Sequence, residues 1–459
     1  MKTFFTKSAL YLALTIPAFF FLGCDDSEEG GSYEFSVEPT VLTFSAKQET
    51  QTLSVRTYGD WSIVLPQDAA WLKVSAMSGR GPAEIEVTAE NYYRTDTSRT
   101  ARLTVTGGNS GDFPVEVVQQ KLLSAAGKAN CYIVPTSGDF AIDAATQGNS
   151  ESEQVGEWTS AELLWEDNRE LITDLYGDPE SKRIFFSTAA AGNAVIAVKD
   201  ASGKILWSWH IWATDFDPNA KTLKYTNDNG STWEFMDRNL GAANAESGSF
   251  GAFGLLYQWG RKDPFTAATA FAPENPSETI RWNMLNNPLP AMASDADSMG
   301  TVQLSIEHPT SFYVTRYAHG DWNGQPDPNL WGAVSGQKTV YDPCPAGWRV
   351  PAYDAQGDSP YAFVTRQTTT GTDNIGRIYT DGNGNDFLFP VAGSRVNGTG
   401  TLDCPGNYGS LWTATGKTTS NEDGTIEYGC LLFFTTGRLV SATYYDTRSQ
   451  GVSVRCVKE

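Results

Sequence analysis

Cys344 lies between two prolines in the stretch YDPCPAGWRVPA, which spans residues 341–352. A cysteine in such a loop can act as a nucleophile, as a metal ligand or as half of a disulfide. A reactive thiolate needs a histidine, a basic group or a helix N-terminus beside it, and within DPCPAGWR only Arg349 is basic. Zinc binding is not favoured, because the chain has no CxxC or HxxxH pattern. Its three histidines form no pair at helical or hairpin spacing: His210, His308 and His319.

The first 24 residues predict export and a lipid anchor. Lys2 and Lys7 precede the apolar run of residues 9–22, which is too short to span a membrane with stop-transfer flanks and therefore indicates a removable signal. The run ends in FLGC, which resembles a bacterial lipobox. The resemblance implies that residues 1–23 are cut off and that the sulfur of Cys24 carries a diacylglycerol. An ordinary secretory signal followed by a free cysteine is the alternative.

Residues 24–33 are expected to form an acidic tether. The segment DDSEEGGS after Cys24 is acidic and small, so it cannot bury enough apolar surface to fold. An acidic stretch directly after a lipidated cysteine also resembles the surface-export signal of lipoproteins in the Bacteroidetes. The sequence therefore predicts a lipid-anchored protein of the outer membrane, exposed at the cell surface.

The five cysteines after Cys24 are expected to pair in an oxidising exterior, which leaves one free thiol. The terminal strand GVSVRCVKE places Val452, Val454 and Cys456 on one face, so that Cys456 points into the core. A loop pinned beside it, as the prolines around Cys344 indicate, completes the bond, and we predict a Cys344–Cys456 disulfide. A second pair is predicted with Cys131 as a competitor: Cys404 and Cys430.

Composition favours a mostly β, multidomain protein. The 459 residues allow several domains, and 12% of them are aromatic. Gly, Thr, Ser and Asn recur between short alternating runs, which favours strands and turns over helices. The formal charge of −21 argues against nucleic acid or anionic lipid as a partner, because both require clustered Lys and Arg. We expect no cofactor.

Residues 34–121 are predicted to form a small β-sandwich. Runs such as AEIEVTAE and TARLTVTG alternate with the period of half-buried strands, and turn residues separate them. The segment resembles a BACON domain, an immunoglobulin-like sandwich named for carbohydrate binding of which many members look like spacers. Trp61 and Trp71 lie among alternating apolar residues, so we place them in the core and not on a sugar platform. The resemblance rests on seven residues that fall in the family's order: Trp61, Trp71, Leu72, Gly79, Gly81, Arg99 and Gln119.

Residues 128–215 are predicted to form a second β-rich sandwich region. The run ILWSWHIWA carries bulky side chains on both of its faces, so both faces of this strand must be covered. His210 within it is therefore expected to be a hydrogen-bonded core or interdomain residue and not a catalyst.

Residues 220–459 are predicted to form one α+β module. Long loops are expected over residues 266–335, where no periodicity is sustained. The stretch DGNGND, residues 381–386, resembles the start of a calcium loop but lacks glycine at its sixth position and a carboxylate at its twelfth, so we expect a tight turn and no metal.

Eight ordered blocks carry a second resemblance, among them NCYIV, MDRNLGA, LLYQWGRKDPF, DPCPAGWRVP and GVSVRCV. The series resembles the Fibrobacter succinogenes major paralogous domain, whose C-terminal part is similar to the C-type-lectin-like fold of formylglycine-generating-type domains. The resemblance implies a scaffold that binds ligands through irregular loops, with the final strand beside the first. Calcium-bridged sugar recognition is not expected, since the chain has no EPN and no WND triplet.

The loops between residues 393 and 448 are the predicted ligand surface, because their side chains stack on sugars or anchor protein interfaces. Trp412 and one of the adjacent Tyr444 and Tyr445 can instead be core, since neighbouring strand residues face opposite sides. Tyr408, the other tyrosine of the pair and Arg448 are then the better candidates. The predicted ligand-binding residues are Arg395, Asn397, Tyr408, Trp412, Tyr444, Tyr445 and Arg448.

Taken together, these patterns predict a non-catalytic surface lipoprotein that binds a glycan or a host or bacterial surface protein. A structural surface protein, such as a spacer or fimbrial component, is the first alternative. An enzyme acting on glycans is the second, and it would need two carboxylates facing a cleft, which the sequence does not show at a recognisable spacing.

The anchor can be tested directly. Cells fed a labelled fatty acid should incorporate the label into this protein, and Cys24→Ala should abolish incorporation because the substitution removes the acceptor sulfur. Cys404→Ala serves as the control and should keep the label. An unlabelled wild-type protein would contradict the anchor.

Overall fold

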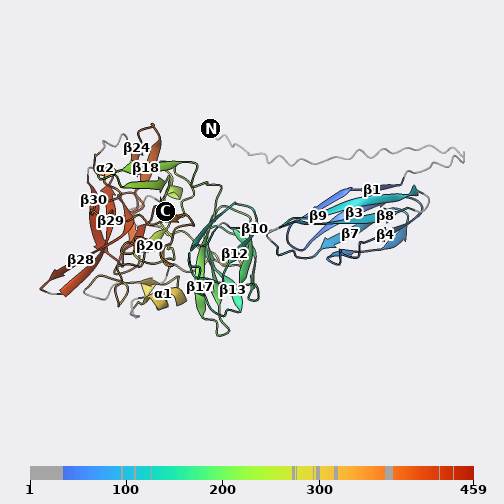
Figure 1. The fold of residues 1–459 in the computed structure, drawn as a ribbon, viewed down its shortest axis with the longest axis horizontal. Coiled ribbons are helices and arrows are strands. Elements are labelled where there is room, and N and C mark those ends of the chain that lie inside the picture. The colour runs from blue at the N-terminus through green and yellow to red at the C-terminus, as the bar shows by residue number, and fades with distance from the viewer. Residues whose placement is uncertain are drawn as a thin grey trace, which may run out of the picture. The chain divides into compact units, whose positions relative to one another are not determined.

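A computed structural model describes most of the chain after the tether (Figure 1). The predicted signal, the tether and Cys24 lie outside the described residues. Among the described residues no helix is long and apolar enough to cross a membrane. The described residues are 35–94, 97–107, 110–125, 127–270, 274, 276–292, 294–295, 300–314, 319–366, 376–422, 424–437 and 439–459.

The structure is nearly all β and forms two compact units, which confirms the predicted fold class. Among the described residues, the first unit holds those up to Leu42, Gln51–Val87 and Arg102–Glu116, and the second holds Thr43–Thr50, Thr88–Ala101 and those from Val117 to Glu459. The finer domain boundaries stay predictions. The helices of the described residues are short: α1 (Val302–Glu307), α2 (Phe363–Arg366) and the 3-10 turn η2 (Phe250–Ala252).

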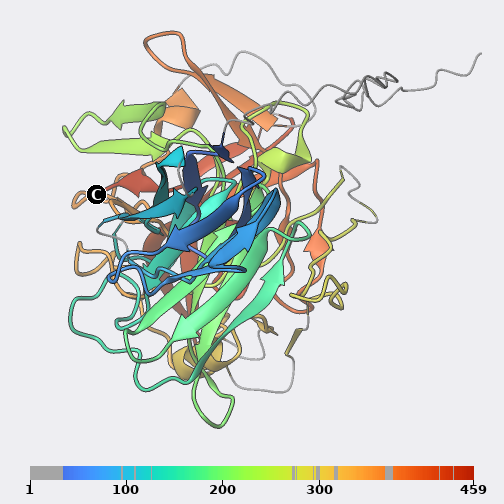
Figure 2. The same cartoon turned by 90° about the vertical axis from the view of Figure 1, so that its right-hand side faces the viewer.

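Two sheets make up the predicted N-terminal sandwich (Figures 1 and 2). Trp61 is buried, and its ring occupies the place of a side chain at Gly79, where an added Cβ would lie 2.4 Å from the indole. Trp71 is only half-buried, so the prediction of a core position holds for Trp61 alone. In sheet order the strands are β1 (Ser36–Glu38), β3 (Glu49–Arg56), β7 (Ala83–Ala89) and β5 (Leu72–Val74), then β2 (Val41–Phe44), β9 (Asp112–Gln119), β8 (Arg99–Thr106), β4 (Asp60–Val64) and β6 (Ser78–Arg80).

A second pair of sheets follows in the second unit. One is ordered β10 (Leu123–Ser124), β12 (Gly138–Asp143), β15 (Arg183–Thr188) and β14 (Ile172–Asp178), and the other β11 (Cys131–Val134), β17 (Ile205–Ala213), β16 (Gly192–Lys199) and β13 (Ser160–Glu166). Strand β17 is buried on both faces, as predicted: Trp209 packs into one apolar core and Trp212 into another. His210 Nε2 lies 3.0 Å from Asn193 Oδ1, and burial lowers the pKa of the imidazole to about 3. His210 is therefore a neutral core residue.

The rest of the second unit is built from short strands and long connections. The terminal strand β32 (Val457–Lys458) pairs with β19 (Thr232–Met236) and with β23 (Trp348–Arg349), and β18 (Thr222–Thr226) completes that sheet. A larger sheet runs β27 (Leu402–Asp403), β26 (Ser394–Arg395), β31 (Gly451–Ser453), β28 (Tyr408–Asn421), β29 (Gly424–Thr435) and β30 (Val440–Thr447), with β20 (Leu256–Gln258) paired to β31. Two small pairs are β21 (Ser294–Asp295) with β22 (Phe312–Tyr313), and β24 (Gly376–Thr380) with β25 (Asp386–Pro390).

The last segment differs from the predicted single strand with one buried face. Every residue of 451–457 is buried, because β31 and β32 are separate strands in two different sheets and protein covers both sides. Cys456 lies just before β32 and is fully buried. The Cys344–Cys456 disulfide is present, with the two Cα atoms 6.0 Å apart and a sequence separation of 112, which confirms this pairing.

The loop that carries Cys344 is held by a buried ion pair. Asp342 accepts hydrogen bonds from the backbone N–H of Cys344 at 2.8 Å and of Val350 at 2.9 Å. Lys338 Nζ lies 3.8 Å from Asp342 Oδ1 and donates to three backbone carbonyls, those of Cys344, Pro345 and Trp348. Lys338, a basic group close to Cys344 in space, thus binds the backbone of this loop.

The predicted Cys404–Cys430 pair is wrong, because Cys131, Cys404 and Cys430 are free thiols in the structure. Cys404 lies in the turn that leads into β28, whose first residue Tyr408 pairs with Thr435 of β29. Cys430 lies five positions before Thr435 along β29, which is about 17 Å at about 3.3 Å per residue. The start of β28, next to Cys404, is therefore far from Cys430 compared with the reach of a disulfide.

The cysteine pattern gives a thiol count. Alkylation of the denatured, unreduced chain from Asp25 onward should label three thiols, and five after reduction. Replacing both Cys344 and Cys456 by alanine should lower the free energy of unfolding by up to about 4–5 kcal/mol, because a closed loop of this length restricts the unfolded chain. Urea unfolding measures this, with Cys404→Ala as the control. Labelling of only one thiol before reduction would contradict the structure and would support a second disulfide, such as Cys404–Cys430.

Candidate functional site

The predicted ligand residues gather on the sheet of β26, β31, β28, β29 and β30, but three of the seven are inside it. Arg395, Trp412 and Arg448 are at most 1% exposed, so none of them can meet a ligand at the surface. The prediction that these three residues contact a ligand is wrong, because their side chains are buried.

Arg448 is enclosed by acidic partners. Its Nη1 lies 3.0 Å from Asp321 Oδ2 and its Nη2 lies 3.0 Å from Glu427 Oε2. The guanidinium also lies 4.3 Å from the ring centroid of Trp259. Two carboxylates and an aromatic face thus compensate the cost of burying this charge, and the residue ties three segments of the module together.

Arg395 and Trp412 have similar internal roles. Arg395 forms an ion pair of 2.7 Å with Glu278 and donates to the Thr266 carbonyl. Trp412 Nε1 donates to the Tyr257 carbonyl at 2.8 Å, which agrees with the alternative that it belongs to the core. Long, polar-tipped side chains in an irregular sheet here serve as cross-links.

Tyr444 and Tyr445 are both exposed, by 44% and 39%, which does not favour the alternative that one of them belongs to the core. They lie on β30, the last strand of its sheet among the described residues, with Tyr444 opposite Leu431 and Tyr445 opposite Cys430. Adjacent residues of a regular strand point to opposite faces, but at this edge the two rings lie side by side, stacked with their centroids 6.3 Å apart. Burial of one tyrosine could not follow from alternation alone.

A row of rings crosses three neighbouring strands here, and we call it the aromatic strip. The ring of Tyr444 stacks on Phe433 and that of Tyr445 meets Tyr428 edge-on, each with centroids 4.9 Å apart. Phe433 in turn lies 5.5 Å from Tyr408. The strip consists of Tyr408, Tyr428, Phe433, Tyr444 and Tyr445.

A cation lies over the strip: Lys417 Nζ is 3.7 Å from the ring centroid of Tyr445. Sequence reasoning missed Lys417, Tyr428 and Phe433 because it searched loops, whereas these residues lie on paired strands. The strand register, with Lys417 opposite Tyr428, is the signal that brings them together. Exposed rings beside an ammonium suit stacking and polar contact and not covalent chemistry.

Tyr408 and Asn397 are partly exposed but already bonded. The Tyr408 hydroxyl donates to Asp403 Oδ2 at 2.9 Å and lies 2.7 Å from Ser394 Oγ, and burial raises its pKa. Asn397 Nδ2 donates to Thr447 Oγ1 at 2.8 Å. The Tyr408 hydroxyl thus links β28 to β26 and β27, and the Asn397 amide fixes the end of β30.

Calcium-bridged sugar recognition was not expected because the EPN and WND triplets are absent, but a third triplet also has to be considered. The chain does contain a QPD triplet, Gln325 to Asp327, which some calcium-dependent lectins use as well. In the structure Asp327 Oδ1 accepts the backbone N–H of Asn329 at 2.8 Å. No three His, Cys, Asp or Glu side chains are grouped as metal ligands in the part of the chain that the structure describes.

Residues 61–120 match the model of the BACON family, described as "Putative binding domain, N-terminal". This confirms the resemblance for that part of the chain. No curated protein matches the sequence.

Solved structures match parts of the chain. A GH5 xyloglucanase from Bacteroides ovatus, in complex with a XXXG heptasaccharide, is 25% identical over 22% of this chain and 22% of its own, with a TM-score of 0.18. A protein from Bacteroides thetaiotaomicron is 20% identical over 21% of this chain and 97% of its own, with a TM-score of 0.16. A protein of unknown function from Porphyromonas gingivalis W83 is 12% identical over 39% of this chain and 99% of its own, with a TM-score of 0.17. This chain spans about a fifth of the xyloglucanase, and these matches assign no site.

The corrected role of Arg448 predicts a large loss of stability. Arg448→Ala leaves the buried Asp321 carboxylate without its counter-charge, so the free energy of unfolding should fall by about 3–5 kcal/mol. The exposed Arg169, which lies over the Trp282 ring in the same unit, is the matched control, and Arg169→Ala should cost less than about 1 kcal/mol. Equal urea midpoints for the two variants would refute the internal role.

Proposed function

We propose that this chain is a surface-displayed lipoprotein that binds a glycan or protein ligand noncovalently, with the aromatic strip as the contact surface. Cys24 carries the lipid, residues 24–33 act as the tether, and the C-terminal module follows the fold implied by its resemblance to the major paralogous domain. The proposal assigns no catalytic residue and no cofactor.

The observation that carries the proposal is the exposure of Tyr444 and Tyr445 beside Lys417. Two adjacent rings at a sheet edge present a broad apolar area at low conformational cost, since each has only two side-chain torsions. Tyrosine and cationic groups are also the types that dominate binding energy at interfaces. A sugar ring or a protein side chain can stack on the same faces.

Support for the strip comes from the rigid elements below it. Strands β28, β29 and β30 form the red end of the chain in Figure 1, and Arg448 and Trp412 fix their inner side. Tyr444 is already packed on Phe433 and Tyr445 on Tyr428, so a ligand does not have to order them. Pre-organisation of this kind lowers the entropic cost of association.

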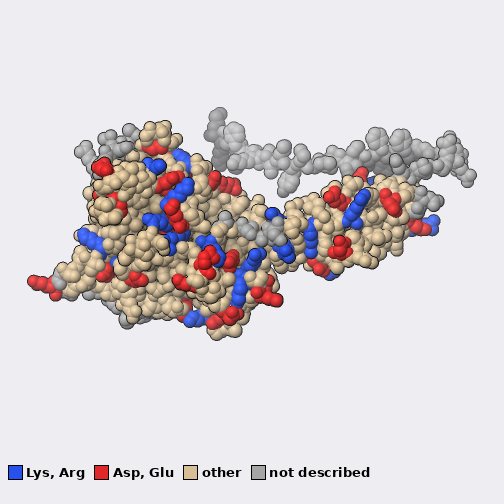
Figure 3. Space-filling model, in the orientation of Figure 1, with Lys and Arg blue, Asp and Glu red and all other residues tan. Residues whose placement is uncertain are grey.

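Charge on the described surface is consistent with a partner that is not nucleic acid. In the view of Figure 3, acidic and basic side chains are interspersed, without a broad basic stripe on that face. The BACON match is consistent with ligand binding in general.

Binding should depend on the two tyrosines. The chain from Asp25 onward, applied to a glycan array and to a panel of surface proteins, should bind at least one class saturably. The double variant Tyr444→Ala/Tyr445→Ala should lose at least tenfold in affinity, which is about 1.4 kcal/mol, because it removes both exposed rings. Binding should persist in a chelator.

Tyr58→Ala is the matched control, since this tyrosine is 62% exposed in the other unit, and its affinity should equal that of the wild type. No binding across both panels would favour the structural alternative. Hydrolysis of any offered polysaccharide would overturn the non-catalytic proposal.

A further inference from the structure

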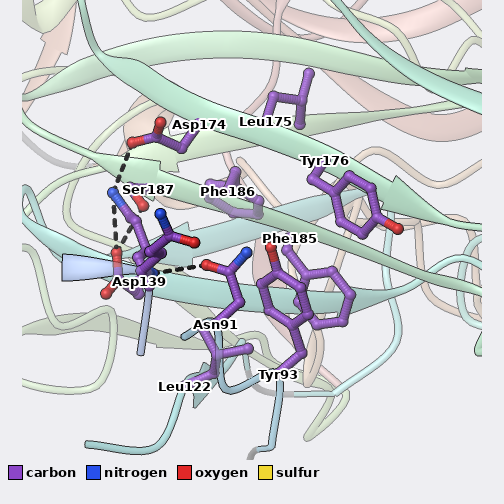
Figure 4. A pocket seen from close by; sticks show the side chains of 12 residues that line it. Asn91, Tyr93, Leu122, Asp139, Asp174, Leu175, Tyr176, Phe185, Phe186 and Ser187 are labelled. Atoms are coloured by element: carbon purple, nitrogen blue, oxygen red, sulfur yellow. Dashed lines mark hydrogen bonds and ion pairs between the residues drawn. The ribbon is translucent and has the colours of Figure 1, made fainter. Parts of the chain in front are cut away.

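A cleft of about 340 Å³ lies in the second unit, away from the aromatic strip (Figure 4). Its floor is the outer face of the sheet of β12, β15 and β14, and its rim comes from Thr43–Thr50 and Thr88–Ala101, which belong to the same unit. The volume is at the lower end of the range for small-ligand sites, about 300–1,000 Å³.

One end of the cleft is aromatic. Tyr93 stacks on Phe185 with centroids 4.5 Å apart, and Tyr176 lies 5.6 Å from Tyr93 and 6.2 Å from Phe185 in a near-parallel arrangement. Phe185 is buried, whereas Tyr176 is 47% exposed. Figure 4 shows the three rings together at this end, so the rings of Tyr93 and Phe185 hold Tyr176 as a fixed platform.

A β-bulge puts the platform there. Thr173 pairs with Ser187 and Tyr176 with Phe185, so β14 has one residue more than β15 between these pairs. Asp174, inside the bulge, has φ +52°, in the left-handed region that costs most residues free energy. With regular pairing onward from Thr173 and Ser187, Tyr176 would lie opposite Ile184 and therefore on the other face from Phe185.

The other end of the cleft is polar. Lys47 Nζ lies 2.7 Å from Asp174 Oδ2 and 3.3 Å from Asp139 Oδ1. Ser187 Oγ donates to Asp139 Oδ1 at 2.6 Å, and the side chain of Asn91 reaches the rim, where its Oδ1 accepts the Gln48 N–H. Asp174 is the most exposed of these charged groups, with 64% of its side chain accessible. Its Oδ1 can accept a hydrogen bond from a ligand hydroxyl, since Lys47 bonds Oδ2.

The charges at this end select among ligands. One ammonium faces two carboxylates, so the local charge is negative and repels a sulfate, a phosphate or a uronate carboxylate. A fixed ring beside hydroxyl-binding carboxylate and amide groups matches the two surfaces of a neutral sugar, its apolar C–H face and its hydroxyl edge.

We infer that this cleft binds a neutral sugar residue of a glycan, stacked on Tyr176 and hydrogen-bonded through Asp174 and Asn91. The inference does not depend on the aromatic strip, because none of the strip's residues lines the cleft. A chain with both sites contacts a glycan at two separate points.

Calorimetric titration of the chain from Asp25 onward tests the cleft. The probes are neutral gluco-, manno- and galacto-oligosaccharides and, in parallel, oligouronates and sulfated oligosaccharides. At least one neutral probe should bind, and Tyr176→Ala should weaken that binding about tenfold, while Tyr176→Phe keeps the ring and should retain it. Tyr444→Ala/Tyr445→Ala should leave the titration unchanged, which separates this cleft from the strip.

Asp174→Asn probes the charge without disturbing the bulge, because asparagine tolerates the left-handed backbone. It should keep neutral-probe affinity within about threefold and reduce the discrimination against oligouronates. Tighter binding of an anionic probe than of any neutral one by the wild type would overturn the inference. So would the absence of binding by every neutral probe, or equal neutral-probe affinity of the wild type and Tyr176→Ala.

Discussion

The buried contact between Lys338 and Asp342 organises the second unit. Charges this far from water are costly, and the cost is offset only when every hydrogen-bonding position is used. Both carboxylate oxygens of Asp342 accept hydrogen bonds from backbone N–H groups of its own loop, and Lys338 donates to three carbonyls of the same loop. The loop is therefore held by these hydrogen bonds in addition to the disulfide of Cys344.

The same loop fastens the module to the sandwich sheet. Asn130, at the start of β11, donates through Nδ2 to the carbonyls of Val340 and Asp342 and accepts from the indole of Trp207. On the other side, Cys456 brings β32 next to β23 and β19. Early, middle and terminal segments thus meet at one small polar centre inside an apolar unit.

Local patterns predicted what depends on local order. Bulky residues on both faces of β17 required cover on both faces. The prolines around Cys344 and the apolar alternation before Cys456 predicted the Cys344–Cys456 disulfide. Arg448 was not predictable in this way, because its partner Asp321 lies 127 residues away and an arginine in a turn-rich segment looks like a surface residue. The bulge at Asp174 was equally hidden, since one extra residue changes which face Tyr176 takes without changing the composition of the strand. The predicted Cys404–Cys430 disulfide was wrong because the sequence shows the number of cysteines but not the pairing of β28 with β29, which keeps Cys430 away from the start of β28.

The Cys344–Cys456 disulfide also changes what a protease can do to this protein. Any single cut between Cys344 and Cys456, for example beside the exposed Glu422 that follows β28, leaves the two fragments joined through sulfur and through the sheets that they share. The strip-bearing strands would then stay with the rest of the chain after nicking. For a surface protein of the kind proposed above, this covalent link adds to the sheet contacts that hold the fragments together after backbone cleavage.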